Sequence, residues 1–278
     1  MNNNHSSSRV GMWLIGAKGG VSTTVMVGLA ALQQKAIDPV GLITATKSFE
    51  NLGLVDFPNI VVGGHDIRGG HLVDEAKKMW NDSRAITPQL LEGAATLFGD
   101  IESRLRPGTL VSAGDTIRSL ADRDSVHLVE TPRQAIDRIR DDIQAFQRSE
   151  NLDNVIGVNV ASTEPPPTMP IPQDFKDVEP LLNSEEKCPL PASSLYYLAA
   201  AEAKASYINF TPSVGATPQC MQQVAYDQHI AHAGCDGKTG ETLLKSVLAP
   251  MFAARNLDVM SWVGHNIFGN MDGKVLDD

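Results

Sequence analysis

The feature that most limits how this chain can fold is a glycine-rich turn close to its N-terminus. Residues 10–15 (VGMWLI) form an apolar run of strand length, and residues 21–32 (VSTTVMVGLAAL) have the small and apolar composition of a helix. Gly16, Gly19 and Gly20 lie between these two segments. Glycines in such a turn let a phosphate group approach the backbone N–H groups at the N-terminus of the following helix. We therefore predict a strand, a glycine turn and a helix in that order.

Further apolar runs predict additional strands. Residues 40–45 (VGLITA) form a continuous apolar run, as expected for a parallel strand that is covered on both faces, and this strand would complete a βαβ unit. Residues 59–62 (NIVV) predict a third strand that ends in the loop GGHDIR, and residues 155–161 and 207–210 predict two more.

The segments between these runs are mostly helical in pattern. Residues 72–148 predict polar-faced helices interrupted at Pro88, Pro107 and Pro132, and residues 195–205 (LYYLAAAEAKA) are strong helix formers. Strands that alternate with helices favour a doubly wound parallel sheet, which binds ligands at the carboxyl ends of its strands.

The glycine turn is compatible with three chemistries. The segment KGGVSTT resembles the phosphate loop of partition-type ATPases, but the lysine that would precede the Ser/Thr pair is missing because Val21 stands there. A dinucleotide site needs the strand, turn and helix that are present, although the spacing is G-x-x-G-G and not G-x-G-x-x-G. The acidic ribose ligand expected after the second strand is absent at residues 44–46, which leaves NAD and NADP as alternatives. A turn that only packs the helix on the strand remains the third possibility.

Composition excludes several classes of protein. The chain has 278 residues, enough for one large domain or two modest ones, and 23 basic against 33 acidic side chains give a net charge of −10. A surface this acidic does not bind nucleic acid or anionic membranes unaided. The three cysteines Cys188, Cys220 and Cys235 cannot all pair, which fits a reducing compartment. Residues 1–9 resemble a polar tail and not a signal peptide, and no apolar stretch is long enough for a membrane span, so we predict a cytoplasmic protein.

Polar residues gather in two segments near the C-terminus. Residues 234–245 (GCDGKTGETLLK) place Lys238 and Lys245 seven residues apart, on one side of a helix, where they could stabilise developing negative charge on a phosphorylated or enolising substrate. A solvated lysine face explains the same spacing. Residues 265–273 (HNIFGNMDG) follow a predicted strand at residues 259–263 and could grip a polar ligand or form a plain turn.

A histidine and cysteine spacing imitates a metal site. His229, His232 and Cys235 are three residues apart from one another, but no fourth ligand is evident. We favour a helix end with two histidines near a buried thiol, and predict no metal.

Several sequence blocks, taken together and in order, resemble the myo-inositol-1-phosphate synthase family, also called inositol-3-phosphate synthase. These blocks extend from residue 10 towards the C-terminus and are VGMWLIGAKGGVSTTVMVGLAAL, IVVGGHDIR, VNVASTEPP, YINFTPS, AGCDGKTGETLLKSVL and SWVGHNIFGNMDG. The resemblance implies a Rossmann-like doubly wound α/β domain followed by the start of an α+β catalytic and tetramerisation domain. The expected boundaries are a disordered tail at residues 1–9, the NAD-binding domain at residues 10–232 and the incomplete second domain at residues 233–278.

The resemblance also implies an activity. Members of this family are NAD-dependent isomerases that convert glucose 6-phosphate to inositol phosphate by oxidation at C5, enolisation, aldol cyclisation and reduction, in inositol and phospholipid biosynthesis. They are cytoplasmic and form homotetramers. Hydride transfer belongs to the cofactor, and the protein supplies donors where oxygens gain charge.

Site residues follow from matching the family pattern position by position. Those implied to hold NAD are Gly16, Gly19, Gly20, Val21, Ser22, Asp66, Ala161, Ser162, Thr163, Thr211, Asp236 and Asp272. Those implied to approach the reacting groups are Lys238, Asp236, Asn266, Asn270 and Asp272. Lys238 is the candidate for stabilising enolate charge, and a lysine with a lowered pKa could also move protons.

The chain departs from the family at its C-terminus. The family pattern continues after the loop at residues 269–273 into a lysine-rich segment, which this chain, ending at Asp278, lacks. We therefore expect an amino-terminal fragment with impaired activity. A non-catalytic NAD-binding module and, less favoured, a partition-type ATPase are the alternatives.

Overall fold

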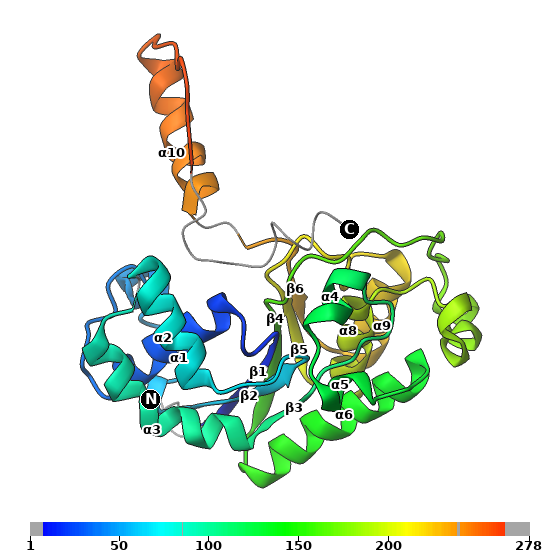
Figure 1. The fold of residues 1–278 in the computed structure, drawn as a ribbon. Coiled ribbons are helices and arrows are strands. Elements are labelled where there is room, and N and C mark those ends of the chain that lie inside the picture. The colour runs from blue at the N-terminus through cyan, green and yellow to red at the C-terminus, as the bar shows by residue number, and fades with distance from the viewer. Residues whose placement is uncertain (1–7, 85, 238–239, 265–278) are drawn as a thin grey trace.

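The fold is built on one parallel β-sheet with helices on both of its faces (Figure 1). The computed structural model describes residues 8–84, 86–237 and 240–264. Its sheet has six strands in the order β3-β2-β1-β4-β5-β6, and every neighbouring pair is parallel. The direction of winding reverses between β1 and β4, which is where doubly wound sheets bind their ligands. The doubly wound α/β fold predicted from the sequence is confirmed.

Strands and helices alternate along most of the chain. The strands are β1 (Val10–Ile15), β2 (Ile60–Asp66), β3 (Leu105–Pro107), β4 (Asn154–Asn159), β5 (Ser206–Asn209) and β6 (His232–Ala233). The helices are α1 (Gly20–Gln33), α2 (Leu72–Ser83), α3 (Pro88–Ser103), α4 (Asp115–Leu120), α5 (Arg123–Val126), α6 (Pro132–Ser149), α7 (Phe175–Val178), α8 (Ala192–Glu202), α9 (Gln219–Gln228) and α10 (Gly240–Ala254). Short 3₁₀ turns at Ile43–Ala45, Lys47–Phe49, Phe57–Asn59, Glu179–Asn183 and Glu185–Lys187 complete the described elements.

An apolar core lies on each face of the sheet. α1, α2 and α3 enclose one core, which includes Leu14 and Phe98, and α6, α8 and α9 enclose the other, which includes Trp13 and Tyr197. Trp13 and Leu14 are successive residues of β1 and therefore point to opposite faces. Because both faces are covered, β1 is a continuous apolar run.

Two of the predicted breaks are helix starts. Pro88 is the first residue of α3, and Pro132 is the first residue of α6, where proline loses no hydrogen bond. The side chain of Thr131 accepts a hydrogen bond from the backbone N–H of Gln134, and the side chain of Gln134 accepts one from the backbone N–H of Thr131, which forms a capping box.

The second predicted strand is wrong. Residues 40–45 form turns and a 3₁₀ helix, and Val40 is 89% exposed. Apolar composition alone indicated a strand there, but no helix buries this segment. The strand that follows α1 in the chain and pairs with β1 is β2. It starts close to the predicted third strand and continues through GGHD to Asp66. Gly64 permits this continuation, since a Cβ atom there would lie 2.1 Å from the carbonyl oxygen of Leu14.

Two further differences concern short segments. β3 lies inside the region predicted to be helical, and residues 259–263, predicted as a strand, form no strand. α10 stands away from the sheet in Figure 1, and none of its residues is buried. No helix in the described part of the chain has both the length and the apolar character needed to cross a bilayer.

Candidate functional site

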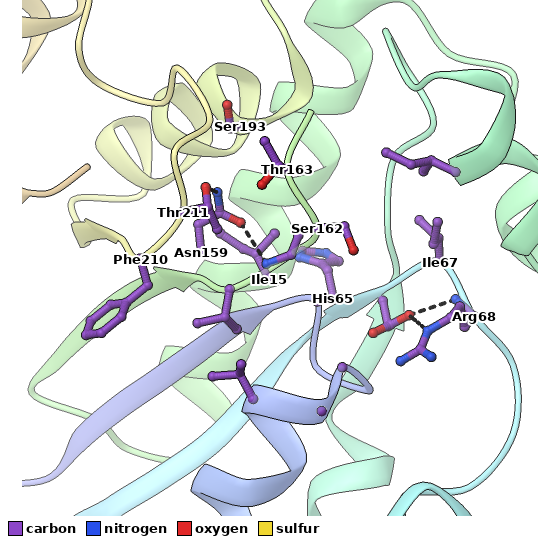
Figure 2. Close-up of a pocket in the computed structure, with 18 of the residues that line it drawn as sticks. Ile15, His65, Ile67, Arg68, Asn159, Ser162, Thr163, Ser193, Phe210 and Thr211 are labelled. Atoms are coloured by element: carbon purple, nitrogen blue, oxygen red, sulfur yellow. Dashed lines mark hydrogen bonds and ion pairs between the residues drawn. The ribbon is translucent and has the colours of Figure 1, made fainter. Parts of the chain in front are cut away.

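A cavity of about 750 Å³ opens at the carboxyl ends of the central strands. Figure 2 shows residues at the ends of β1, β2 and β4 and in the segment after β5 around it, with Arg68 on one side and Phe210 on the other. The sequence-predicted residues that line it are Gly16, Gly19, Gly20, Val21, Asp66, Ala161, Ser162, Thr163, Thr211 and Asp236. Residues as far apart in the sequence as Gly16 and Asp236 are thus brought into one cavity.

The glycine turn is anchored to β2 by its backbone. The amides of Gly16 and Ala17 both donate to the carbonyl oxygen of His65, each over 3.0 Å. Gly16 has a positive φ of +85°, and a Cβ atom there would lie 2.8 Å from Cα of Ala161, in the segment that follows β4. Only glycine combines this backbone conformation with so close an approach.

The N-terminus of α1 lies at the cavity, and no N-cap side chain accepts a hydrogen bond from its backbone amides. Gly19 is the N-cap and provides no side-chain acceptor, and the first turn contains no acidic residue. The first helical hydrogen bond runs from the amide of Thr23 to the carbonyl of Gly19, so the preceding helical amides have no acceptor within the helix. Amides without a helical acceptor at the positive end of a helix fit a diphosphate group.

Ser22 differs from its predicted neighbours. Its side chain is fully buried, is not part of the cavity wall, and donates a 2.7 Å hydrogen bond from Oγ to the carbonyl oxygen of Gly16. The hydroxyl group therefore braces the turn from behind.

Asp66 lies at the end of β2, which is the position of the acidic ribose ligand in dinucleotide folds. The sequence analysis found no acidic residue after the second strand because it chose residues 40–45 as that strand, whereas the true second strand ends in Asp66. Asp66 Oδ2 accepts from the amide of Lys18 at 2.6 Å, and Oδ1 accepts from the amide of Arg68 at 2.8 Å. A carboxylate has about four acceptor sites, so capacity for a hydroxyl group remains.

Lys18 does not point where a phosphate-loop lysine would. Its ammonium group donates to the carbonyl oxygen of Arg68 over 2.8 Å, and the Arg68 guanidinium lies 3.5 Å from Asp66 Oδ1. These charges hold the loop after β2 against the glycine turn.

A network of neutral side chains holds the loops after β4 and β5. Asn159 Nδ2 donates to Asn209 Oδ1 (3.2 Å) and to Thr211 Oγ1 (3.3 Å), and Thr211 Oγ1 donates to Asn209 Oδ1 over 2.7 Å. Asn209 Nδ2 donates to the carbonyl oxygen of Ser213 over 2.7 Å. All four residues are buried or nearly so, and such a satisfied network gives the cavity a fixed floor. The sequence analysis does not single out either asparagine, although each lies within a predicted strand and is the last residue of the observed one.

His65 is a second residue that the sequence analysis does not single out. It is fully buried, its Nδ1 accepts from Trp13 Nε1–H over 2.9 Å, and its Nε2 lies 3.1 Å from Asp142 Oδ2. Burial lowers the pKa of His65, although Asp142 opposes this shift. The neutral tautomer with its proton on Nε2 satisfies both contacts.

Other predicted residues lie outside the described part of the chain or on the surface of α10. Lys238, Asn266, Asn270 and Asp272 lie outside the described residues. Lys245 forms a 2.8 Å ion pair with Glu241 on the surface of α10, which is a solvated arrangement. Among the residues that the structure describes, no group of three or more His, Cys, Asp or Glu side chains, including those at 229, 232 and 235, is arranged to hold a metal ion.

The sequence is similar to known families and proteins. The profile of the NAD-binding domain of myo-inositol-1-phosphate synthase matches residues 10–255, and a second profile of myo-inositol-1-phosphate synthase matches residues 240–278. Inositol-3-phosphate synthase 1 of Bacteroides thetaiotaomicron is 28% identical over 289 residues, covering 98% of this chain and 64% of that protein. Inositol-3-phosphate synthase of Drosophila melanogaster is 29% identical over 238 residues, covering 82% of this chain and 39% of that protein. The chain thus spans less than two thirds of the length of these two relatives.

The fold is similar to two solved structures. The crystal structure of inositol-3-phosphate synthase from Caenorhabditis elegans matches with a TM-score of 0.74 at 18% identity, covering 90% of this chain and 53% of the other. A myo-inositol-1-phosphate synthase-related protein from Thermotoga maritima matches with a TM-score of 0.62 at 21% identity, covering 89% and 60%. Because the profile of the NAD-binding domain extends from β1 through α10, the chain belongs to the myo-inositol-1-phosphate synthase family.

Proposed function

We propose that the cavity binds NAD, with the diphosphate at the N-terminus of α1. The adenosine half would lie towards Asp66, and the nicotinamide half would lie towards Thr211 and Asp236. The single observation that carries this proposal is geometric: the bare helix N-terminus, the acidic end of β2 and the ends of β4 and β5 line one cavity at the point where the winding of the sheet reverses.

NAD is favoured over NADP by the position of Asp66. Its carboxylate would accept a hydrogen bond from a ribose hydroxyl group, whereas it would repel a phosphate on the same oxygen. Arg68 is the nearest cation to that position, but its backbone amide and guanidinium are already directed at Asp66. NADP is therefore expected to bind more weakly than NAD.

We further propose that the chain acts as an inositol-3-phosphate synthase on glucose 6-phosphate. Bound NAD would supply a hydride acceptor for oxidation at C5 and a donor for the final reduction, so the net reaction is an isomerisation. The family resemblance implies that Lys238, Asn266, Asn270 and Asp272 approach the reacting groups, and Lys238 is the candidate for stabilising the enolate charge. On this proposal residues 10–232 hold the cofactor and residues 233–278 begin the catalytic domain of a cytoplasmic homotetramer in inositol and phospholipid biosynthesis.

Calorimetry and an activity assay test the two parts separately. We expect NAD to bind with a stoichiometry near one, NADP to bind more weakly, and ATP not to be hydrolysed. Inositol phosphate formation from glucose 6-phosphate is then measured with NAD present. Binding without turnover would leave the cofactor site standing and would overturn the isomerase assignment for this chain. Failure to bind NAD would overturn both.

A further inference from the structure

The carboxyl group of Glu164, in the cavity wall, has one oxygen atom with a hydrogen-bond partner and one without, among the described residues. Glu164 follows β4, and its Oε1 atom accepts a 2.6 Å hydrogen bond from the backbone amide of Ser193, the second residue of α8. Both residues line the cavity. Glu164 therefore supplies the N-terminus of α8 with an acceptor that its N-cap, Pro191, does not provide.

The second oxygen of this carboxyl group is unsatisfied. Glu164 Oε2 is buried and has no hydrogen-bond partner among the described residues, although the residue as a whole keeps some exposed surface. Burial raises the pKa of Glu164, while its hydrogen bonds to Ser193 and Ser213 oppose the shift. A buried carboxylate oxygen without a hydrogen-bond partner is costly, and a donor from a molecule bound in the cavity that Glu164 lines would stabilise it.

The position of Glu164 indicates which part of a ligand would supply that donor. In a doubly wound sheet each half binds one mononucleotide, on either side of the point where the winding reverses. Asp66 ends β2 in one half, whereas Glu164 and Ser193 belong to the half that contains β4 and β5. In Figure 2, Thr163, the neighbour of Glu164, and Ser193 lie nearer to Thr211, after β5, than to Arg68.

We propose that Glu164 is a binding residue for the nicotinamide nucleoside, and that its Oε2 atom accepts a hydrogen bond from an N–H or O–H group there. The proposal rests on the proposed function and deepens it by naming a contact at the reacting end of the cofactor. The donor is either the carboxamide N–H of nicotinamide or a hydroxyl group of its ribose. In either case a neutral group would donate a hydrogen bond to a buried carboxylate oxygen.

Three ligands and two variants test this assignment by calorimetry. Glu164→Gln keeps an oxygen for the Ser193 amide and replaces the Oε2 acceptor with an NH₂ group. We expect it to weaken NAD binding by about tenfold to a hundredfold and to leave ADP binding unchanged, because ADP lacks the nicotinamide nucleoside. ADP-ribose separates the two donors: a matching loss assigns the ribose hydroxyl, and an unchanged affinity assigns the carboxamide.

Glu102→Gln is the matched control. Glu102 Oε1 likewise accepts a 2.6 Å hydrogen bond from the backbone amide of Leu72 at the start of α2, but Glu102 is not part of the cavity wall. This variant is expected to leave all three affinities unchanged. Equal affinities of Glu164→Gln and the parent protein for NAD would overturn the proposal. An equal loss for NAD and ADP would also overturn it, because the effect would then act through the whole cavity.

A measurement on the unmodified protein keeps the proposal testable if Glu164→Gln does not fold. We expect saturating NAD to shift the amide resonance of Ser193, and ADP to leave it in place. The amide of Leu72 should shift with neither ligand. Identical Ser193 shifts with NAD and ADP would overturn the assignment of Glu164, even if NAD binding by the parent protein supports the proposed function.

Discussion

The two halves of the cavity share one type of turn after their strands, but the side chain that forms the turn is charged in one half and neutral in the other. β2, β4 and β5 each end in an Asp or Asn whose side chain accepts the backbone amide two residues further on. The distances are 2.8 Å for Asp66 and Arg68, 3.3 Å for Asn159 and Ala161, and 3.1 Å for Asn209 and Thr211. Only the turn after β2 uses a charged group.

The cavity therefore has a charged side chain in one half and a rigid network of neutral side chains in the other. In the β2 half, the Asp66 carboxylate accepts from the backbone amides of Lys18 and Arg68, and the Arg68 guanidinium lies 3.5 Å from it. In the half that contains β4 and β5, neutral amides and a hydroxyl group satisfy one another in the interior. A neutral network avoids the cost of burying unpaired charge, and it depends more strongly on every one of its members.

The largest effect is expected where the two halves meet. Gly16→Ala adds a methyl group close to Cα of Ala161 on a backbone with positive φ, and should lower the free energy of unfolding by about 3 kcal/mol. NAD binding should be lost together with the shape of the turn. Chemical denaturation and calorimetry check both results.

Gly41→Ala is the control for backbone strain alone. Gly41 has a similar φ of +83°, but a Cβ atom there meets nothing within 4 Å. Its cost should be about 1 kcal/mol, with unchanged NAD affinity. Equal costs at both positions would contradict the view that the approach to Ala161 shapes the turn.

The two types of strand end should differ in stability. Asn209→Ala removes the acceptor of two Thr211 groups and the donor to Ser213, so it should lower the free energy of unfolding by about 2–3 kcal/mol. Asp66→Asn is also at a buried position, but it keeps one of the two oxygen acceptors and should cost about 1–2 kcal/mol. Parallel denaturation curves test this order, and a larger cost for Asp66→Asn would show that charge dominates over the buried network.

The smallest effect concerns pH. The pKa of His65 is lowered by burial, with Asp142 opposing and Arg138 and Arg106 supporting the shift. As the pH falls from about 7, the unfolded chain binds a proton at this residue near pH 6.5 while the folded chain does not, so stability decreases towards acid. A single group contributes at most about 1.4 kcal/mol per pH unit.

His65→Gln should therefore flatten the dependence of unfolding free energy on pH between about 7 and 5. Denaturant titrations at several pH values measure the slope. His127→Gln serves as the control, since the side chain of His127 is exposed. An unchanged slope in His65→Gln would mean that His65 is protonated in the folded protein.

The sequence predicts the fold better than it predicts the cavity wall. Continuous apolar runs identified β1, β4 and β5, because strands covered on both faces need such residues. The same rule failed at residues 40–45, since apolar composition does not reveal whether a helix will cover a segment. The true β2 contains Gly63 and Gly64, and glycine has low strand propensity. Both glycines leave room for residues of the neighbouring elements, because a Cβ atom would lie 2.9 Å from the Trp13 ring at position 63 and 2.1 Å from the Leu14 carbonyl oxygen at position 64.

The predicted site residues followed from motif order, and many of them line the cavity. The residues that the sequence does not reveal act through tertiary contacts. Asn159 and Asn209 are distant in the sequence and become partners only through the pairing of β4 with β5. The unsatisfied oxygen of Glu164 likewise depends on where α8 begins.

The double acceptance at the carbonyl oxygen of His65 has an evolutionary consequence. The bonds that fix the turn run from main chain to main chain, so no side-chain identity at positions 16, 17 or 65 is needed to make them. Residues around the turn can therefore be substituted without a change in its shape, provided that glycine remains at position 16, where φ is positive.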